Sequence, residues 1–250
     1  MNKRNLSKWN KNTGDVIKDT LTCLAEGITG IAASDRKELA FSVGHIFQSL
    51  RKGQFLSKFL AEWRDYCDKG RIPKDYQETE QHHTCLQELL EFIDKDSPDE
   101  IRFETLKRIF LVAATETASD RNSLLPYQFL RLCRSMSSGE IIVLNTTYKI
   151  ARSGQMPNLS AASLWLDAIA KESGLGHASL VEIYEEELIK KHLITRRVHT
   201  DGSGVDAKPN FRLTSLALEL CKYIDSYDNA SGETQHVDST DGGEAPRPQC

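Results

Sequence analysis

The stretch from Ser179 to Tyr227 constrains the fold more than any other part of the chain, because its spacing changes from helical to extended and back. Its first part predicts a helix whose apolar residues recur at intervals of three and four: Leu180, Ile183, Tyr184 and Leu188. Residues 193–198 form a short stretch rich in β-branched side chains, which is typical of a strand. Residues 201–204 (Asp-Gly-Ser-Gly) supply the positive φ angles of a tight turn. Residues 211–214 resume the extended pattern, and Thr214 is an expected N-cap. The order predicted is helix, strand, turn, strand, helix.

Upstream, a series of segments carries apolar residues at helical spacing, and each predicts an amphipathic helix. Helices are expected over 15–27 and 35–53, the second ending at Gly53, followed by a third that ends near Gly70 and forms a hairpin with the second. Another is expected over 78–94. Ser97 is an expected N-cap with Pro98 in the first helical position, and a further helix begins near Ser123.

Two cap signals open the C-terminal part of the chain. Ser137 and Glu140 have capping-box spacing, and Ser160 is the expected cap of the next helix. The closing helix after Thr214 carries its inward residues at helical spacing: Ala217, Leu220, Cys221 and Ile224. Three helices, a two-stranded β-hairpin and a closing helix are therefore predicted from residue 137 onward.

Together these segments predict a mainly α-helical protein of four parts. A basic flexible arm covers 1–14, a helical bundle 15–136, the hairpin-bearing unit 137–227, and a disordered acidic tail 228–250. The tail is rich in Gly, Ser, Thr, Asp and Pro, and it has too little apolar surface to offset the entropy of ordering.

Composition excludes some classes of protein. A net charge of −4 argues against a uniformly basic nucleic-acid coat. The longest apolar run, Ile109 to Ala114, is far shorter than the roughly 20 residues of a membrane span. No apolar stretch follows the basic residues at the N-terminus, so we predict no secretion signal, no membrane association and a cytoplasmic location.

The sequence predicts no metal site and no cofactor. The 6 cysteines have no paired spacing, which favours reduced thiols that pack as small hydrophobes, as at Cys67, Cys133 and Cys221. The one tight cluster of metal-capable side chains is His82, His83 and Cys85. Adjacent helical residues point about 100° apart, and no second pair has zinc spacing, so helix-surface positions are the favoured interpretation.

No motif of an enzyme occurs. Gly202-Ser203-Gly204 is not followed by the Gly-Lys-Ser/Thr of a phosphate loop, and no nucleophile elbow is present. We predict a protein that is not an enzyme, with a hydrolase or nuclease of dispersed site residues as an open alternative. One aromatic group fits core packing better than a stacking platform for bases: Phe55, Phe59, Trp63 and Tyr66.

Two pieces of sequence carry a resemblance to known families. LIKKHLITRR (188–197) and FRLTSLALEL (211–220) resemble the wing signature of MarR-type and PadR-type regulators, over about a third of the chain. His192 stands where those families have glycine, and Leu216-Ala217 replace a glycine after Leu213-Thr214. The resemblance implies a winged-helix-like unit over 137–227. The helical front and C-terminal LT helix are also similar to bacterial Abi-alpha abortive-infection proteins.

The winged-helix resemblance implies DNA binding, with the helix over 179–190 in the major groove and the wing on the backbone. The candidate phosphate contacts are the six basic residues of 188–214: Lys190, Lys191, Arg196, Arg197, Lys208 and Arg212. The same helix carries four carboxylates, which repel a polyanion: Glu182, Glu185, Glu186 and Glu187.

The acidic helix and the helical front favour a non-enzymatic binding protein of bacterial or phage origin. We expect it to act through contacts with another protein, a phage protein being one candidate, in phage exclusion or abortive infection. The alternative is a transcriptional regulator that binds DNA through the wing.

Overall fold

The computed structural model describes residues 43, 46, 49–96, 99–115, 124–153, 162–196 and 212–232. Helices make up 81% of this described part, which contains no strand. The predicted all-α architecture is therefore confirmed at this level. No helix in the described ranges is long and apolar enough to cross a membrane.

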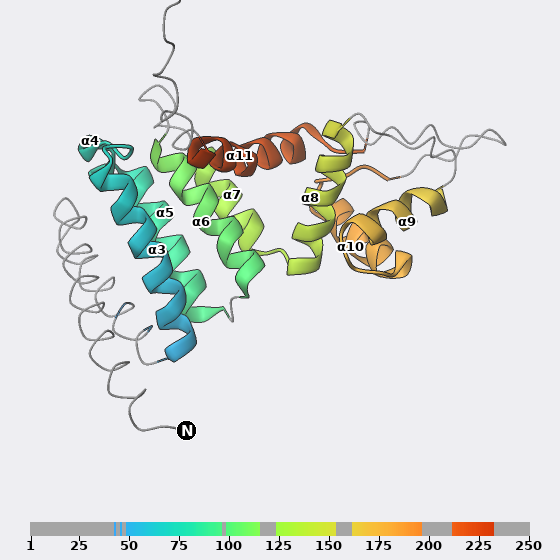
Figure 1. Cartoon of the computed structure of the whole chain (residues 1–250), viewed down its shortest axis with the longest axis horizontal. Helices are drawn as coiled ribbons and strands as arrows, with labels where there is room; N and C mark the ends of the chain where they lie inside the picture. Colours follow the sequence, from blue (N-terminus) through green and yellow to red (C-terminus); the bar gives the residue numbers. More distant parts are fainter. Residues whose placement is uncertain are drawn as a thin grey trace, which may run out of the picture.

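The N-terminal part of the described chain is a helical bundle, which lies at the left of Figure 1. It is formed by α3 (Leu50–Asp68), α4 (Lys74–Gln77), α5 (Glu80–Lys95), α6 (Glu100–Thr115) and α7 (Leu125–Arg134). α6 lies against α3, α5 and α7, and it has buried side chains on most of its surface. The longest apolar run of the sequence, Ile109 to Ala114, belongs to this helix. The apolar run is long because α6 has neighbours on several sides, and a stretch of helix that is covered on several sides carries apolar residues all round.

Two helix starts differ from the expectation. α3 begins at Leu50 and runs through Gly53, so the prediction that Gly53 ends a helix is wrong. The chain is extended at Ser49, which places the break there and leaves Gly53 in the first turns of α3, where glycine costs little. α6 begins at Glu100, and the carboxylate of Asp99 accepts a hydrogen bond from the backbone N–H of Arg102, 3.1 Å away. Asp99 is therefore its N-cap rather than Ser97.

The chain continues with α8 (Ser138–Ser153), α9 (Ala162–Glu172), α10 (Ala178–Lys190) and α11 (Ser215–Gly232). In Figure 1, α8, α9 and α10 lie to the right of the bundle. α11 packs along both α6 and α8 (Figure 1), and the buried side chains form one continuous core. α11 continues past Tyr227, where the sequence predicted its end. Tyr227 stacks on Tyr66 and donates a hydrogen bond to Glu62 of α3. α11 therefore joins the C-terminal helices to the bundle.

The predicted caps of α8 and α11 are confirmed. The Ser137 N–H donates to the Glu140 carboxylate at 2.7 Å, and the Glu140 N–H donates to the Ser137 hydroxyl at 3.3 Å, which is a capping box. The Thr214 hydroxyl accepts from the Ala217 N–H at 3.2 Å. The four residues of α11 that were predicted to face inward are buried: Ala217, Leu220, Cys221 and Ile224. Other expectations lie outside the described residues: the arm 1–14, the helix 15–27, the cap at Ser160 and the tail beyond 232.

The contact between α8 and α10 depends on a glycine. A Cβ added at Gly139 would lie 2.1 Å from Cζ of Tyr184. We expect Gly139→Ala to lower the free energy of unfolding by about 1–3 kcal/mol, because overpacking outweighs the gain in helix propensity of about 1 kcal/mol. In a Tyr184→Ala background the same change should become neutral or stabilising. Urea unfolding of the four proteins measures this, and a destabilisation that persists without the tyrosine would contradict it.

Candidate functional site

Four of the six predicted phosphate contacts lie within the described residues, and three of these are held by carboxylates. Lys190 pairs with Glu187 at 2.6 Å on the surface of α10. Lys191 donates to Glu140, the buried carboxylate of the capping box. Burial raises the pKa of Glu140, but the hydrogen bonds from Lys191 and Ser137 outweigh this and lower it. These basic residues therefore stabilise the fold locally.

The third of these ion pairs is buried. Nη1 of Arg212 lies 2.5 Å from Oε1 of Glu185, and both side chains are only 6% exposed. Arg212 lies in the second predicted strand, whereas Glu185 lies in the middle of α10, so the pair holds the two segments together. A guanidinium in this position has no surface to offer a phosphate. Arg196 is exposed, while Arg197 and Lys208 lie outside the described residues.

The two predicted strands meet at one antiparallel bridge, between Ile194 and Leu213. On either side of it, the Thr195 N–H donates to the Arg212 carbonyl at 2.6 Å, and the Thr214 N–H donates to the Leu193 carbonyl at 3.0 Å. This pairing brings the end of α10 beside the start of α11. Residues 197–211, which include the predicted turn at 201–204, lie outside the described part.

His192 closes α10 in a left-handed conformation, with a φ of 58°. Its N–H donates to the Ile189 carbonyl at 3.0 Å, and the Leu193 N–H donates to the Leu188 carbonyl at 2.9 Å. These are the two bonds of a Schellman motif, in which glycine is preferred at the left-handed position. The histidine therefore occupies a backbone position that a glycine would adopt without steric cost.

We expect His192→Gly to raise the free energy of unfolding by about 1 kcal/mol, because a side chain in the left-handed region costs about 1–2 kcal/mol, partly offset by chain entropy. His192→Ala, which keeps a Cβ, should bring no such gain. Thermal unfolding of both variants beside wild type is the measurement. Equal melting temperatures for the glycine and alanine variants would show that the backbone is not strained here.

The orientation of α10 differs from the expectation. Its buried residues are Val181, Glu185 and Leu188, whereas Ile183, predicted to face inward, is 58% exposed. Since Arg212 neutralises Glu185, this carboxylate occupies an inward position, and Ile183 lies on the opposite side of the helix. The apolar spacing in the sequence did not reveal this because it treats every glutamate as a surface residue.

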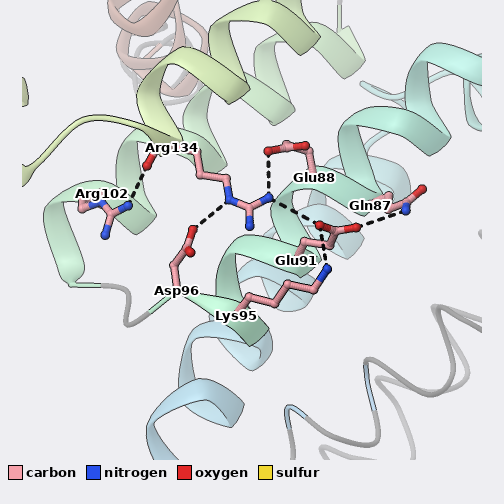
Figure 2. Close-up of polar contacts among 7 residues, drawn as sticks. All are labelled: Gln87, Glu88, Glu91, Lys95, Asp96, Arg102 and Arg134. Atoms are coloured by element: carbon pink, nitrogen blue, oxygen red, sulfur yellow. Dashed lines mark hydrogen bonds and ion pairs between the residues drawn. The ribbon is translucent and has the colours of Figure 1, made fainter.

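A polar groove about 680 Å³ in volume runs between α5 and α7. Arg134 lies at its centre (Figure 2). The guanidinium is 2.9 Å from Glu88, 3.5 Å from Glu91 and 2.8 Å from Asp96. Burial lowers the pKa of Arg134, but hydrogen bonds to Asp96 and Glu88 outweigh this and raise it. Arg102 donates to the Arg134 carbonyl at 2.7 Å, and therefore fixes the end of α7 as well.

This network is best described as a structural hub. The carboxylates of the groove already have Arg134 as their counterion, and Lys95 adds a further ion pair to Glu91 at 3.1 Å (Figure 2). Asp99 contacts Ser138 at 2.5 Å, so the α7–α8 connection is held to the bundle at this end. The network in the groove therefore joins α7 to α5 and to Asp96, and the separate contact of Ser138 with Asp99 joins the start of α8 to the start of α6.

We expect Arg134→Met to lower the free energy of unfolding by about 2 kcal/mol at pH 7, because three half-buried carboxylates lose their shared cation. Burial raises the pKa of Glu91, but hydrogen bonds from Lys95 and Gln87 and the charges of Lys95 and Arg134 outweigh this and lower it. The stabilisation from this carboxylate is complete well above its ordinary pKa of 4.5 and is lost as the pH falls, so the loss in Arg134→Met should be smaller at pH 4. Urea unfolding at both pH values is the measurement. Lys171→Met, at an exposed position of α9 outside the groove, is the control and should change stability by less than about 0.5 kcal/mol. A loss of the same size at pH 4 would contradict the ion-pair explanation.

The predictions about aromatic and metal-capable side chains can be compared with the core. The aromatic group of α3 is buried, which confirms core packing: Phe55, Phe59, Trp63 and Tyr66. The prediction of helix-surface positions is wrong for His82 and Cys85, which are buried, because this face of α5 packs against the aromatic core. A ring nitrogen of His83 lies 3.0 Å from the Gln77 carbonyl. In the described ranges, no group of three or more His, Cys, Asp or Glu residues is arranged to hold a metal ion.

The exposed face of α10 therefore remains as the surface feature with unusual chemistry, and the groove around Arg134 as a structural one. The carboxylates of α10 were visible in the sequence, but the exposure of Ile183 and the network around Arg134 had no local signal, because each depends on a partner more than 25 residues away. No protein-family model matches the chain, and neither a curated protein nor a solved structure is significantly similar to it.

Proposed function

We propose that the chain is a non-enzymatic binding protein that acts through protein–protein contacts of a winged-helix-like C-terminal unit. The observation that carries this proposal is the state of the basic residues. Lys191 and Arg212 are committed to Glu140 and Glu185, and Lys190 pairs with Glu187. A unit that binds DNA needs free cations on this surface, because phosphate contacts supply most of the affinity.

The helix that would enter the major groove also has the wrong charge for DNA. Glu182 and Glu186 are exposed on α10, beside the exposed Ile183. Carboxylates repel a polyanion, whereas an apolar side chain among them is a common feature of protein-binding surfaces. A role in phage exclusion or abortive infection rests on the similarity to Abi-alpha proteins, and a phage protein is then one candidate partner.

A DNA-binding regulator is the second candidate, and the exposed Arg196 favours it. This residue follows the bridge between Ile194 and Leu213, at the start of the predicted wing. A wing of this kind contacts the DNA backbone. The two candidates differ in their dependence on salt.

The test is the binding of a fluorescent 30-base-pair duplex at 50 and 200 mM salt. A regulator should bind at low salt, lose affinity steeply at high salt, and lose part of this slope in the Arg196→Ala/Arg197→Ala variant. We expect no binding at either salt concentration. Affinity purification from infected and uninfected source cells should instead recover a stoichiometric protein partner. Salt-dependent DNA binding with no such partner would replace the proposal with the regulator.

A further inference from the structure

One face of α10 forms a continuous exposed stripe, which we call the α10 outer stripe. Its members recur at intervals of three and four residues: Ser179, Glu182, Ile183, Glu186 and Lys190. The stripe is about 16 Å long at the helical rise of 1.5 Å per residue. Ile183 lies near its middle and is 58% exposed. The opposite face of the helix, with Val181 and Leu188, is buried.

The charge of the stripe is unbalanced towards the acidic side. Among the described residues, no ion pair involves Glu182 or Glu186, whereas the single lysine of the stripe is bound to Glu187 at 2.6 Å. The two carboxylates flank Ile183, one on each side along the helix. The stripe therefore offers an apolar side chain between two carboxylates that form no ion pair with the part of the chain that the structure describes.

We infer that the α10 outer stripe is a docking surface for a cationic amphipathic helix of a partner protein. The inference rests on the proposed function and names the chemistry of the partner. A helix that packs along α10 places side chains three and four residues apart against the stripe, so one apolar residue covers Ile183 while lysine or arginine residues before and after it reach Glu182 and Glu186. Charge complementarity selects this occupant over an acidic segment or a nucleic acid.

The fixed orientation of α10 supports this assignment. The buried pair of Glu185 with Arg212 lies on the opposite face and holds the helix so that Ile183 points outward. Gly139 allows Tyr184 to pack closely against the start of α8, which also fixes the helix. A surface presented by a rigid helix binds with a smaller entropy cost than a mobile one.

The test uses two labelled 18-residue model peptides and the full chain. One peptide is an amphipathic helix of leucine and lysine, and the other has glutamate in place of every lysine. The cationic peptide should bind, the anionic one should not, and binding should weaken when salt is raised from 50 to 300 mM. Glu182→Gln/Glu186→Gln should weaken binding about tenfold, and Ile183→Ser by a similar factor, as expected for two charge contacts and one buried apolar contact.

Matched variants separate the stripe from general acidity. Glu78→Gln/Glu219→Gln removes the same charge from exposed positions on other elements, and Leu164→Ser removes the exposed leucine of α9, which is 49% exposed. Both should bind the cationic peptide as wild type does. Circular dichroism confirms that each variant is folded. The inference is overturned if the cationic peptide fails to bind, if the anionic peptide binds equally, or if stripe and control variants weaken binding alike.

Failure of this inference is distinguishable from failure of the proposed function. If purification from cells recovers a stoichiometric partner that the stripe variants still bind, the protein-contact function stands and the stripe is not its surface. If the partner is lost with Glu182→Gln/Glu186→Gln and retained with Glu78→Gln/Glu219→Gln, both are supported.

Discussion

Lowering the pH from 7 to 5 should remove about 2 kcal/mol from the free energy of unfolding through His82 alone, and the loss should reach about 4 kcal/mol near pH 3. Burial lowers the pKa of His82 from 6.5 to about 3, with a smaller contribution from the neighbouring His83. The unfolded chain therefore takes up a proton near pH 6.5 that the folded chain does not. Stability from the neutral ring is complete above pH 6.5 and is lost as the pH falls towards 3.

The cause is the aromatic surroundings of His82. Its ring lies 5.7 Å from the Trp63 ring, 5.3 Å from Tyr76 and 5.5 Å from Phe110, and the side chain is fully buried. Neither ring nitrogen has a hydrogen-bond partner among the described residues. A charged imidazole would lose its hydration without gaining a carboxylate, and the neutral form is therefore the one that fits.

The measurement is urea unfolding of wild type and His82→Leu at pH 7 and pH 5. Comparison of the two pH values within each protein cancels the packing that leucine loses or gains, and the leucine variant should show a pH dependence smaller by about 2 kcal/mol. His177→Gln, which removes an exposed histidine, is the control and should keep the wild-type dependence. Equal pH dependence in wild type and His82→Leu would contradict the prediction, because it would show that His82 takes up its proton as readily in the folded protein as in the unfolded chain.

Much of the helical part could be predicted because its signals are local. The capping box of Ser137 with Glu140 and the cap at Thr214 depend on residues within one turn, and both are confirmed. The helix start at Leu50 was missed for a related reason. Glycine is a common helix end, but its effect depends on its place in the turn, and at Gly53 the preceding break at Ser49 decides the boundary.

The candidate surface could not be predicted, because it depends on contacts between distant residues. Arg134 forms ion pairs with carboxylates of α5 and of the loop that follows it. The spacing of residues along the chain does not indicate these pairs. Ile183 was expected on the buried face of α10, because an analysis of apolar spacing treats isoleucine as a core residue and glutamate as a surface residue. Its exposure follows from Arg212, 27 residues after Glu185, which compensates the charge of a buried carboxylate.

Arg212→Met should lower the free energy of unfolding by about 3–5 kcal/mol, because it leaves the Glu185 carboxylate inside without the guanidinium that neutralises it. Glu185→Leu/Arg212→Met, which replaces both charges with apolar side chains, should recover most of the loss. Urea unfolding of wild type, both single variants and the double variant gives the coupling energy. Lys190→Met is the control, since its pair with Glu187 is exposed to solvent and screened by it, so this variant should unfold at the same urea concentration as wild type.

The size of that coupling energy separates two explanations of why α10 presents Ile183 to solvent. If the ion pair fixes the helix, Arg212→Met is strongly destabilising and the double variant is close to wild type. If the apolar contacts of Val181 and Leu188 fix it, Arg212→Met costs little, because Glu185 can then reach solvent by a small local movement. The buried positions of both charged side chains favour the first explanation, since a carboxylate with an easy path to water would not remain 6% exposed.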